Sequence, residues 1–519
     1  MTEPLLNTWQ DQPNIKSTKP LATGEGVLDA ASFDTIEVDK LFDSVNHALT
    51  IAGQATLYRS LTQPLNNLDD IQAKQQAVEE LRQNPALLEA LDGMIHTASV
   101  QEKDFYLLLF GEFLGTFGTA KHDYEIEGYG YLHYKRGIRL LLNLVENINN
   151  APQPNSRYLQ TLFNKIKNFA QSRAYSLMSE TVFITENGIK SKQEHNWWMP
   201  AVMFTPRLFK PLIIGLLVLV FFLASEFLPI PDEILLVSPL LLVYIPLVGG
   251  FDRDSCIIPL RNIFKTAPEV AQTLDALGQL DELLSFIKFS VAFGHDTVLP
   301  EMCEDEHHQI HLQNAKNPVL GKENPQYVGN DFDMTDDKLV LITGPNSGGK
   351  TAFCKTLTQI QLLAQIGSLV PASFAKLTVA DRIFYQGSEG SHLNDGEGRF
   401  GTELRRTKDI FLASTAKSLV VLDELSEGTT FEEKMEASSN VLNGFYRKGN
   451  STVLITHNHQ LVDQFAKQKI GIPKQVEFAN DEPTYKLING ISRVSHADRV
   501  AKKIGFSKED IDNYLAGKQ

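Results

Sequence analysis

Apolar residues recur at helical spacing through much of the first 300 positions of the chain, in the stretches 33–91, 101–195 and 265–298. The run 69–81 opens with two aspartates, as helices often do, and a break rich in Pro and Asn falls at 151–155. We therefore predict an all-α domain from this part of the chain.

A different pattern begins at about His311, where short apolar runs alternate with helical ones. The runs Leu339–Thr343, Leu419–Leu422 and Thr452–Thr456 are typical of buried strands, and a helical pattern follows the first two. Strands that alternate with helices indicate βαβ units and a mostly parallel sheet. We predict an α/β domain over 311–519.

The segment between these two parts is strongly apolar. Leu212–Ala224 has no charged residue, and neither has 234–251, while basic residues flank the pair on both sides and acids occupy the turn. A membrane span needs about 20 such residues, and basic flanks face the cytoplasm. We predict a transmembrane helical hairpin over 207–252, and hence a multi-pass membrane protein with two spans and a cytoplasmic α/β domain. Because the runs are short and contain prolines, the alternative is a buried pair of core helices in a cytoplasmic protein.

Composition narrows the classes further. The 519 residues are 43% hydrophobic and 21% charged, which is typical of globular domains, and the formal net charge of −15 argues against a protein that coats polyphosphates. The three cysteines, Cys256, Cys303 and Cys354, lie far apart, so they form neither a zinc motif nor a disulfide framework, as expected in a reducing compartment. The polar stretch 1–19 is not a secretory signal peptide.

The strongest chemical signal is a glycine-rich loop between a predicted strand and a predicted helix. It consists of Gly344, Pro345, Asn346, Ser347, Gly348, Gly349, Lys350 and Thr351, and Ala352 follows. This is the pattern G-x-x-x-x-G-K-[ST], in which backbone N–H groups surround phosphate oxygens. Lys350 is expected to reach the β- and γ-phosphates, and the Thr351 hydroxyl to bind Mg²⁺.

Two later strands end in polar residues that complement this loop. Asp423 and Glu424 follow one strand, so Asp423 is a candidate for the Mg²⁺ shell and Glu424 for the base that activates water. His457 follows the next strand and is a candidate sensor of the γ-phosphate.

The order of these elements resembles the ATPase domain of MutS proteins, within the ABC ATPase class. The matching runs are ITGPNSGGKT, LLAQIGSLVPAS, ADRIF, LVVLDELSEGTT and ITHNHQLV. The resemblance implies ATP and Mg²⁺ as cofactors, a homodimer with C-terminal dimerisation helices, and DNA as a partner. The run 326–332 resembles the segment that lines the nucleotide base, so Tyr327 is the candidate for stacking. The stretches 34–65 and 274–290 resemble the core and lever helices.

The signature loop, GEGRFGTEL at 396–404, is similar to that of the family but altered. The resemblance implies that Gly396, Arg399, Phe400 and Glu403 complete the site of the partner subunit. The hydroxyl that the family usually supplies falls at Gly398, so that Arg399, Thr402 or backbone N–H groups are the alternatives.

These expectations combine into one organisation. The predicted parts are a leader (1–33), an all-α core and lever domain (34–206), the hairpin (207–252), a helical return (253–310) and an ABC-type P-loop ATPase domain (311–519). Only about 33 residues precede the core, so we expect no mismatch-recognition domain, and 101–265 occupies the place of the DNA clamp.

We predict an ATPase that couples hydrolysis to lever-helix motion on mismatched or branched DNA near a membrane. The alternative is a nucleotide-switched membrane scaffold that binds proteins or lipids and not DNA.

Overall fold

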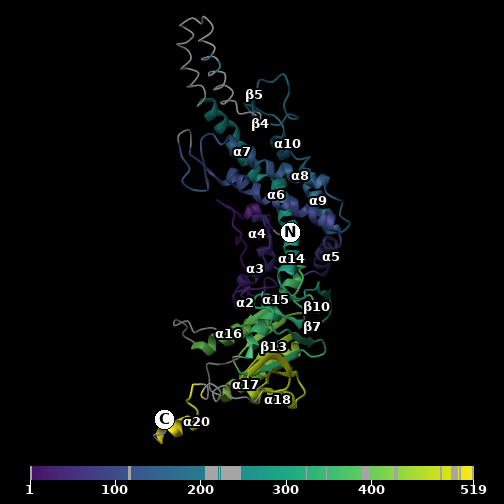
Figure 1. Ribbon diagram of the computed structural model, residues 1–519, viewed down its shortest axis with the longest axis vertical. Coiled ribbons are helices and arrows are strands. Elements are labelled where there is room, and N and C mark those ends of the chain that lie inside the picture. The colour runs from purple at the N-terminus through teal and green to yellow at the C-terminus, as the bar shows by residue number, and fades with distance from the viewer. Residues whose placement is uncertain are drawn as a thin grey trace. The chain divides into compact units, whose positions relative to one another are not determined.

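The computed structural model describes residues 3–114, 118–204, 220, 223, 247–322, 324–345, 348–387, 398–425, 431–479, 482–492, 501 and 504–516 (Figure 1). They fall into two compact units. The first comprises Met1–Ser17, Ala48–Leu57 and Glu79–Leu284, and the second comprises Thr18–His47, Tyr58–Val78 and Ser285–Gln519. Three of the boundaries, after Leu57, Val78 and Leu284, fall within the helices α4 (Ile51–Thr62), α5 (Leu68–Gln83) and α14 (Pro268–Ala292).

A six-stranded sheet forms the centre of the second unit, in the order β11-β12-β13-β9-β14-β15. Its strands are β9 (Leu339–Thr343), β11 (Ile383–Gln386), β12 (Leu419–Asp423), β13 (Ser451–Ile455), β14 (Ile472–Ala479) and β15 (Glu482–Asn489). Neighbouring strands are parallel except β14 and β15, which pair antiparallel. The mixed α/β fold predicted for this part of the chain is confirmed.

Helices bury the apolar strands of this sheet. They are α15 (Lys350–Gln365), α16 (Gly398–Ala413), α17 (Phe431–Lys448) and α18 (His459–Lys467). Helix α17 contacts β13 and helix α18 contacts β14 (Figure 1). Leu339 and Leu341 of β9 pack in one cluster with Phe445 of α17 and Phe465 of α18. Every residue of β9 is buried, which explains why its sequence is apolar without alternation.

The described part of the second unit also contains a smaller sheet and further helices. The sheet has the order β6-β10-β7-β8, with β6 (Glu301–Cys303), β7 (Ile310–Ala315), β8 (Asn330–Met334) and β10 (Phe374–Thr378). The helices are α2 (Ala30–Ile36), α3 (Val38–Val45), α20 (Lys508–Leu515) and the parts of α4, α5 and α14 that belong to this unit. Strand β8 comes directly before β9 in the chain, so the segment 326–332 precedes the strand that leads into the glycine-rich loop.

The first unit is mainly helical. Besides parts of α4, α5 and α14 it contains α1 (Leu5–Thr8), α6 (Pro85–Phe110), α7 (Tyr131–Gly137), α8 (Arg139–Asn150), α9 (Arg157–Phe169), α10 (Arg173–Ser179), the π-helix η1 (Arg253–Ile257) and α13 (Ile258–Thr266). In α9 the buried residues Leu159, Leu162, Phe163 and Ile166 follow the spacing of one helix face, as the sequence pattern indicated.

Five short strands in the first unit differ from the all-α expectation. They are β1 (Glu112–Phe113), β2 (Glu125–Ile126), β3 (Val182–Thr185), β4 (Gly188–Lys190) and β5 (Val202–Phe204). Strands β3 and β4 form a hairpin in which Gly188 has φ 99° and its carbonyl accepts a hydrogen bond from Thr185 Oγ1. Asn and Gly in the turn and β-branched residues before it favour this hairpin over a helix.

The side chains of two buried acidic residues of the first unit hold the start of α4. Asp281 Oδ2 accepts hydrogen bonds from the backbone N–H and the hydroxyl of Thr50, at 2.7 and 2.6 Å. Glu102 Oε1 accepts from Ile51 N at 2.6 Å. A Cβ on Gly53 would lie 2.2 Å from Asp281 Oδ2, so the close approach of α14 to α4 requires glycine there.

The predicted transmembrane hairpin and the multi-pass membrane location are wrong by this structure. Among the described residues, no helix is both long enough and apolar enough to cross a bilayer. The longest, α6 and α14, carry charged side chains such as Asp104 and Glu282, which a bilayer core disfavours. Most of the segment 207–252 lies outside the described residues.

Candidate nucleotide-binding site

The glycine-rich loop joins the end of β9 to the start of α15, as its sequence predicts. Gly344 and Gly349 have φ of 141° and 80°, backbone conformations that other residues adopt at a cost. Asn346 and Ser347 lie outside the described residues. Gly349 is the N-cap of α15, so the loop places phosphate-binding N–H groups at a helix N-terminus.

Lys350 points back into this loop. Its ammonium donates to the carbonyl oxygens of Gly344 and Pro345, at 2.7 and 2.8 Å, and the residue is 3% exposed. Burial lowers the pKa of Lys350, while the carboxylates of Asp423 and Glu424 oppose that effect. The ammonium group of Lys350 therefore lies beside the loop that is expected to bind phosphates.

Thr351 and Asp423 meet across the sheet edge. Thr351 Oγ1 donates to Asp423 Oδ2 at 2.9 Å, and Asp423 ends β12. Burial raises the pKa of Asp423, although the hydrogen bond from Thr351 opposes the rise. Two oxygen ligands fit Mg²⁺, which completes its shell with phosphate oxygens and water in such sites. No group of three or more His, Cys, Asp or Glu side chains in the described part of the chain could hold a metal by itself.

Glu424 and His457, which follow adjacent strands, lie within hydrogen-bond distance of each other. Glu424 Oε1 lies 3.1 Å from His457 Nε2. The hydrogen bond from His457 holds the pKa of the Glu424 carboxyl below its usual value, which keeps that group ionised. Glu424 also has a φ of 62°, and its N–H donates to the carbonyl of Ile455 at 3.0 Å. The backbone therefore aims this side chain in a conformation unusual for a non-glycine residue.

A cavity of about 400 Å³ opens beside the loop, and Tyr327 lines it together with Gly348, Gly349 and Ala352. Burial raises the pKa of the Tyr327 hydroxyl. The cavity volume lies within the range of small-ligand sites, about 300–1,000 Å³. The structure thus brings Tyr327 to the phosphate loop, from which strands β8 and β9 separate it in sequence.

Tyr485 is a cavity-lining residue that sequence reasoning missed. It lies on β15, and a Cβ added to Gly349 would be 3.2 Å from its ring. Asn330 fixes this part of β15, because its amide donates to Tyr485 O at 2.9 Å and its carbonyl accepts from Leu487 N at 2.8 Å. Tyr485 has a φ of 60°. It begins the run YKLING, which resembles the tail of the MutS ATPase domain, but that resemblance gave the residue no role at the nucleotide site.

The predicted signature residues are only partly described. Gly396 and the side chain of Arg399 lie outside the described residues, whereas Phe400 and Glu403 belong to the first turns of α16. The carbonyl of Glu403 accepts a hydrogen bond from Gln386 Nε2 at 3.1 Å. None of the residues that line the cavity comes from α16.

Comparison with known families agrees with this geometry. A family model of MutS domain V matches residues 340–514, and a model of MutS domain III matches residues 29–286. The chain belongs to the MutS family. The domain V match contains Lys350, Thr351, Asp423, Glu424 and His457, while Tyr327 precedes it.

Similar proteins include several described as DNA mismatch repair protein MutS. The protein from Desulforamulus reducens is 36% identical over 209 residues, which is 38% of this chain and 23% of the relative. Those from a Thermotoga species and from Ehrlichia chaffeensis are 31% and 28% identical, over 47% and 48% of this chain and 32% and 31% of the relatives. The matched part therefore covers about a quarter to a third of these MutS proteins.

Proposed function

We propose that the protein is an ATPase of the MutS family that hydrolyses ATP to ADP and phosphate. The observation that carries this proposal is the convergence of Lys350, Thr351, Asp423, Glu424 and His457 at one edge of the main sheet. A cation, two metal-binding oxygens and an ionised carboxylate are the groups that phosphoryl transfer to water requires.

The site residues divide the chemistry among them. Loop N–H groups and Lys350 bind the phosphates, and Lys350 must leave the carbonyls of Gly344 and Pro345 to do so. Thr351 and Asp423 hold Mg²⁺, which neutralises charge on the phosphates when it is bound. Glu424 orients the attacking water and accepts its proton, and His457 positions that carboxylate through their hydrogen bond.

We assign the cavity between Tyr327 and Tyr485 to the nucleotide base. The cavity adjoins Gly348 and Gly349, so a nucleotide whose phosphates lie on the loop places its base there. Aromatic rings stack on the face of any base, whichever hydrogen-bond donors and acceptors the base carries at its edge. Tyr327 and Tyr485 therefore contribute to the affinity for the nucleotide, whereas the residues at the sheet edge carry out the reaction.

A second copy of the chain completes the site in this proposal. Gly396, Arg399, Phe400 and Glu403 of one subunit approach the γ-phosphate bound by the other. In support, no described residue of α16, Phe400 and Glu403 included, is among the residues that line the cavity. Three helices, α4, α5 and α14, contribute residues to both units and are the proposed levers.

DNA in mismatched or branched form is the proposed partner on which the movement of the lever helices acts. Its support is that the relatives are described as DNA mismatch repair proteins, although this chain matches only about a quarter to a third of their length. Affinity that rests on phosphate contacts falls steeply as salt rises. A duplex with a mismatch, a four-way junction and a plain duplex, each titrated at two salt concentrations, measure this directly. Equal and salt-independent binding of all three would favour the protein scaffold instead.

The ATPase assignment is tested with Glu424→Gln in the full chain. We expect this variant to bind ATP with Mg²⁺ like the natural protein and to lose about 10²–10⁴-fold in turnover. Glu433→Gln, on α17 outside the sheet edge, is the matched control with the same charge change. Full turnover in Glu424→Gln would overturn the assignment of the base. No saturable ATP binding in the natural protein would overturn the function.

A further inference from the structure

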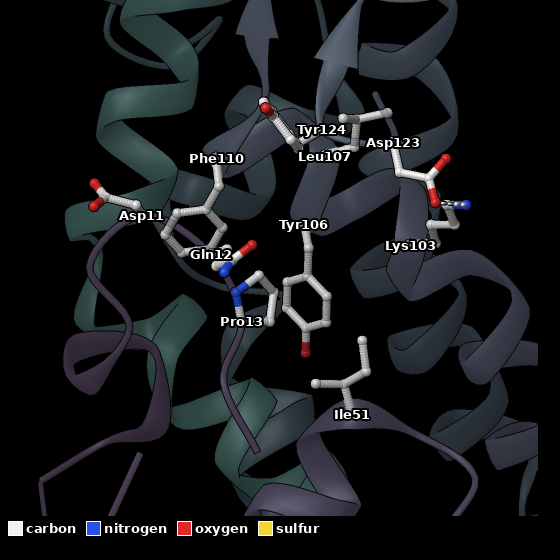
Figure 2. A pocket seen from close by; sticks show the side chains of 11 residues that line it. Asp11, Gln12, Pro13, Ile51, Lys103, Tyr106, Leu107, Phe110, Asp123 and Tyr124 are labelled. Atoms are coloured by element: carbon white, nitrogen blue, oxygen red, sulfur yellow. Dashed lines mark ion pairs between the residues drawn. The ribbon is translucent and has the colours of Figure 1, made fainter. Parts of the chain in front are cut away.

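The helical unit contains a pocket of about 390 Å³, shown in Figure 2. One wall is the N-terminal segment at Asp11 and Pro13, and another is the end of α6 with Tyr106 and Phe110. Its volume lies within the range of small-ligand sites, about 300–1,000 Å³, and most of its lining is apolar. It belongs to a different unit from the nucleotide site.

Contacts with α6 and α13 hold the N-terminal wall of this pocket. The ring of Trp9 packs edge-on against Tyr106, with centroids 5.2 Å apart. Trp9 Nε1 donates to the carbonyl of Asn14 at 2.9 Å, and Lys265 Nζ donates to the carbonyl of Gln10 at 3.1 Å. The N-terminal segment is therefore held on both sides of Asp11, and little conformational entropy remains to be lost when a ligand binds.

The charges of the pocket lie at its rims. Figure 2 shows Asp11 and Asp123 on opposite sides, with the rings of Phe110 and Tyr106 between them. Lys103 is the cation among the lining residues, and its ammonium lies 3.7 Å from Asp123. Both partners of that pair are mostly exposed, so it contributes little and is easily displaced. An apolar floor between two acidic rims suits a long molecule with a positive charge at each end.

One ring of the pocket already binds an ammonium group. Lys265 Nζ lies 4.5 Å from the centroid of Phe110. The face of an aromatic ring carries negative charge, and a cation over it gains about 0.5–2 kcal/mol. Lys265 therefore covers one face of Phe110, and to the pocket this ring contributes apolar surface.

We propose that this pocket binds a linear alkyl diammonium, with its methylene chain across Tyr106 and Phe110 and an ammonium group at each of Asp11 and Asp123. The methylenes replace water on the apolar floor, while both charged ends stay at the solvated rims, as long cationic side chains do on protein surfaces. An anion meets two carboxylates there, and a neutral chain leaves them unused.

The test is calorimetric titration of the full chain with cadaverine, in about 0.15 M salt to screen diffuse attraction. Pentanediol, which has the same carbon chain without charge, is the comparison ligand. We expect saturable binding of one cadaverine and at least about tenfold weaker binding of pentanediol. No saturable binding of cadaverine, or equal binding of the two, would overturn the proposal.

Variants locate the site. Asp11→Asn with Asp123→Asn is expected to weaken cadaverine binding at least about tenfold. Glu89→Gln with Glu186→Gln makes the same charge change on exposed residues outside the pocket and is expected to leave binding unchanged. Equal losses in the two double variants would mean that the acidic surface as a whole attracts the amine, and the pocket would be rejected.

Discussion

Arg406 of α16 forms a bidentate ion pair with Asp29, the N-cap of α2, across 377 positions of sequence. The two hydrogen bonds measure 2.7 and 3.0 Å, and Asp29 also accepts from the N–H of Ser32 at 2.9 Å. Burial alone would raise the pKa of Asp29, but the hydrogen bonds from Arg406 and Ser32 lower it on balance. The pair ties the helix that carries Phe400 and Glu403 to the segment before the helical core.

Replacement of Arg406 by Met is expected to destabilise the second unit by about 3–5 kcal/mol, because it leaves the buried carboxylate of Asp29 without its partner. Denaturant unfolding measures this loss. Lys408→Met changes an exposed cation of the same helix and should shift the free energy of unfolding by less than about 0.5 kcal/mol. Similar values for the two variants would show that the ion pair contributes nothing specific.

Glu102 predicts a pH dependence of stability. Burial, with a smaller effect of Asp281, raises the pKa of Glu102 to about 8, against the backbone hydrogen bond from Ile51. The folded state therefore holds a proton that the unfolded chain releases near pH 4.5, so stability is full below about pH 4.5 and falls as pH rises towards 8. Glu102→Gln keeps an acceptor for Ile51 N–H and should flatten this slope. Unfolding curves between pH 5 and 9 that keep the slope in the variant would assign it to another group.

The sequence could predict those parts of the site that are formed by one continuous stretch of the chain. The loop from Gly344 to Thr351 and the strands that end at Asp423 and Ile455 combine a local pattern with a local structure, so neither depends on distant contacts. Their bounds in the structure agree with the predicted runs within a residue or so. The proximity of Thr351 and Asp423 followed from the rule that parallel strands end at one edge.

What the sequence could not predict depends on packing between distant segments. Tyr485 reaches Gly349 only because β15 joins the sheet beside β14, and Asp29 meets Arg406 only because α2 packs on β11. The apolar run at 207–252 misled for the opposite reason, since hydrophobicity alone does not distinguish a span from other uses of apolar residues. Strands β3 and β4 were missed because short hairpins give a weak period.

Tyr485 should govern affinity for ATP and not turnover at saturation. Tyr485→Asn removes the ring, and asparagine tolerates the φ of 60° at this position. Loss of one stacking partner costs about 1–3 kcal/mol, so the Kd for ATP should rise between about fivefold and 150-fold. Nucleotide titration gives the Kd, and steady-state assays give kcat. Tyr485→Phe, which keeps the ring, should bind like the natural protein; an equal loss there would assign the effect to the hydroxyl.

His457 should set the acid limb of the ATPase pH profile through Glu424. The hydrogen bond from His457 lowers the pKa of Glu424, so this carboxylate stays ionised at a lower pH than an ordinary glutamate does. His457→Ala removes that donor while burial of Glu424 persists, and the pKa of Glu424 should rise. The catalytic form is the ionised one, so the acid limb of kcat should move to higher pH, whereas His457→Gln, which keeps an N–H donor, should move it less. A uniform fall in kcat with an unchanged limb would contradict this coupling, and would mean that His457 acts on the phosphate and not through the base.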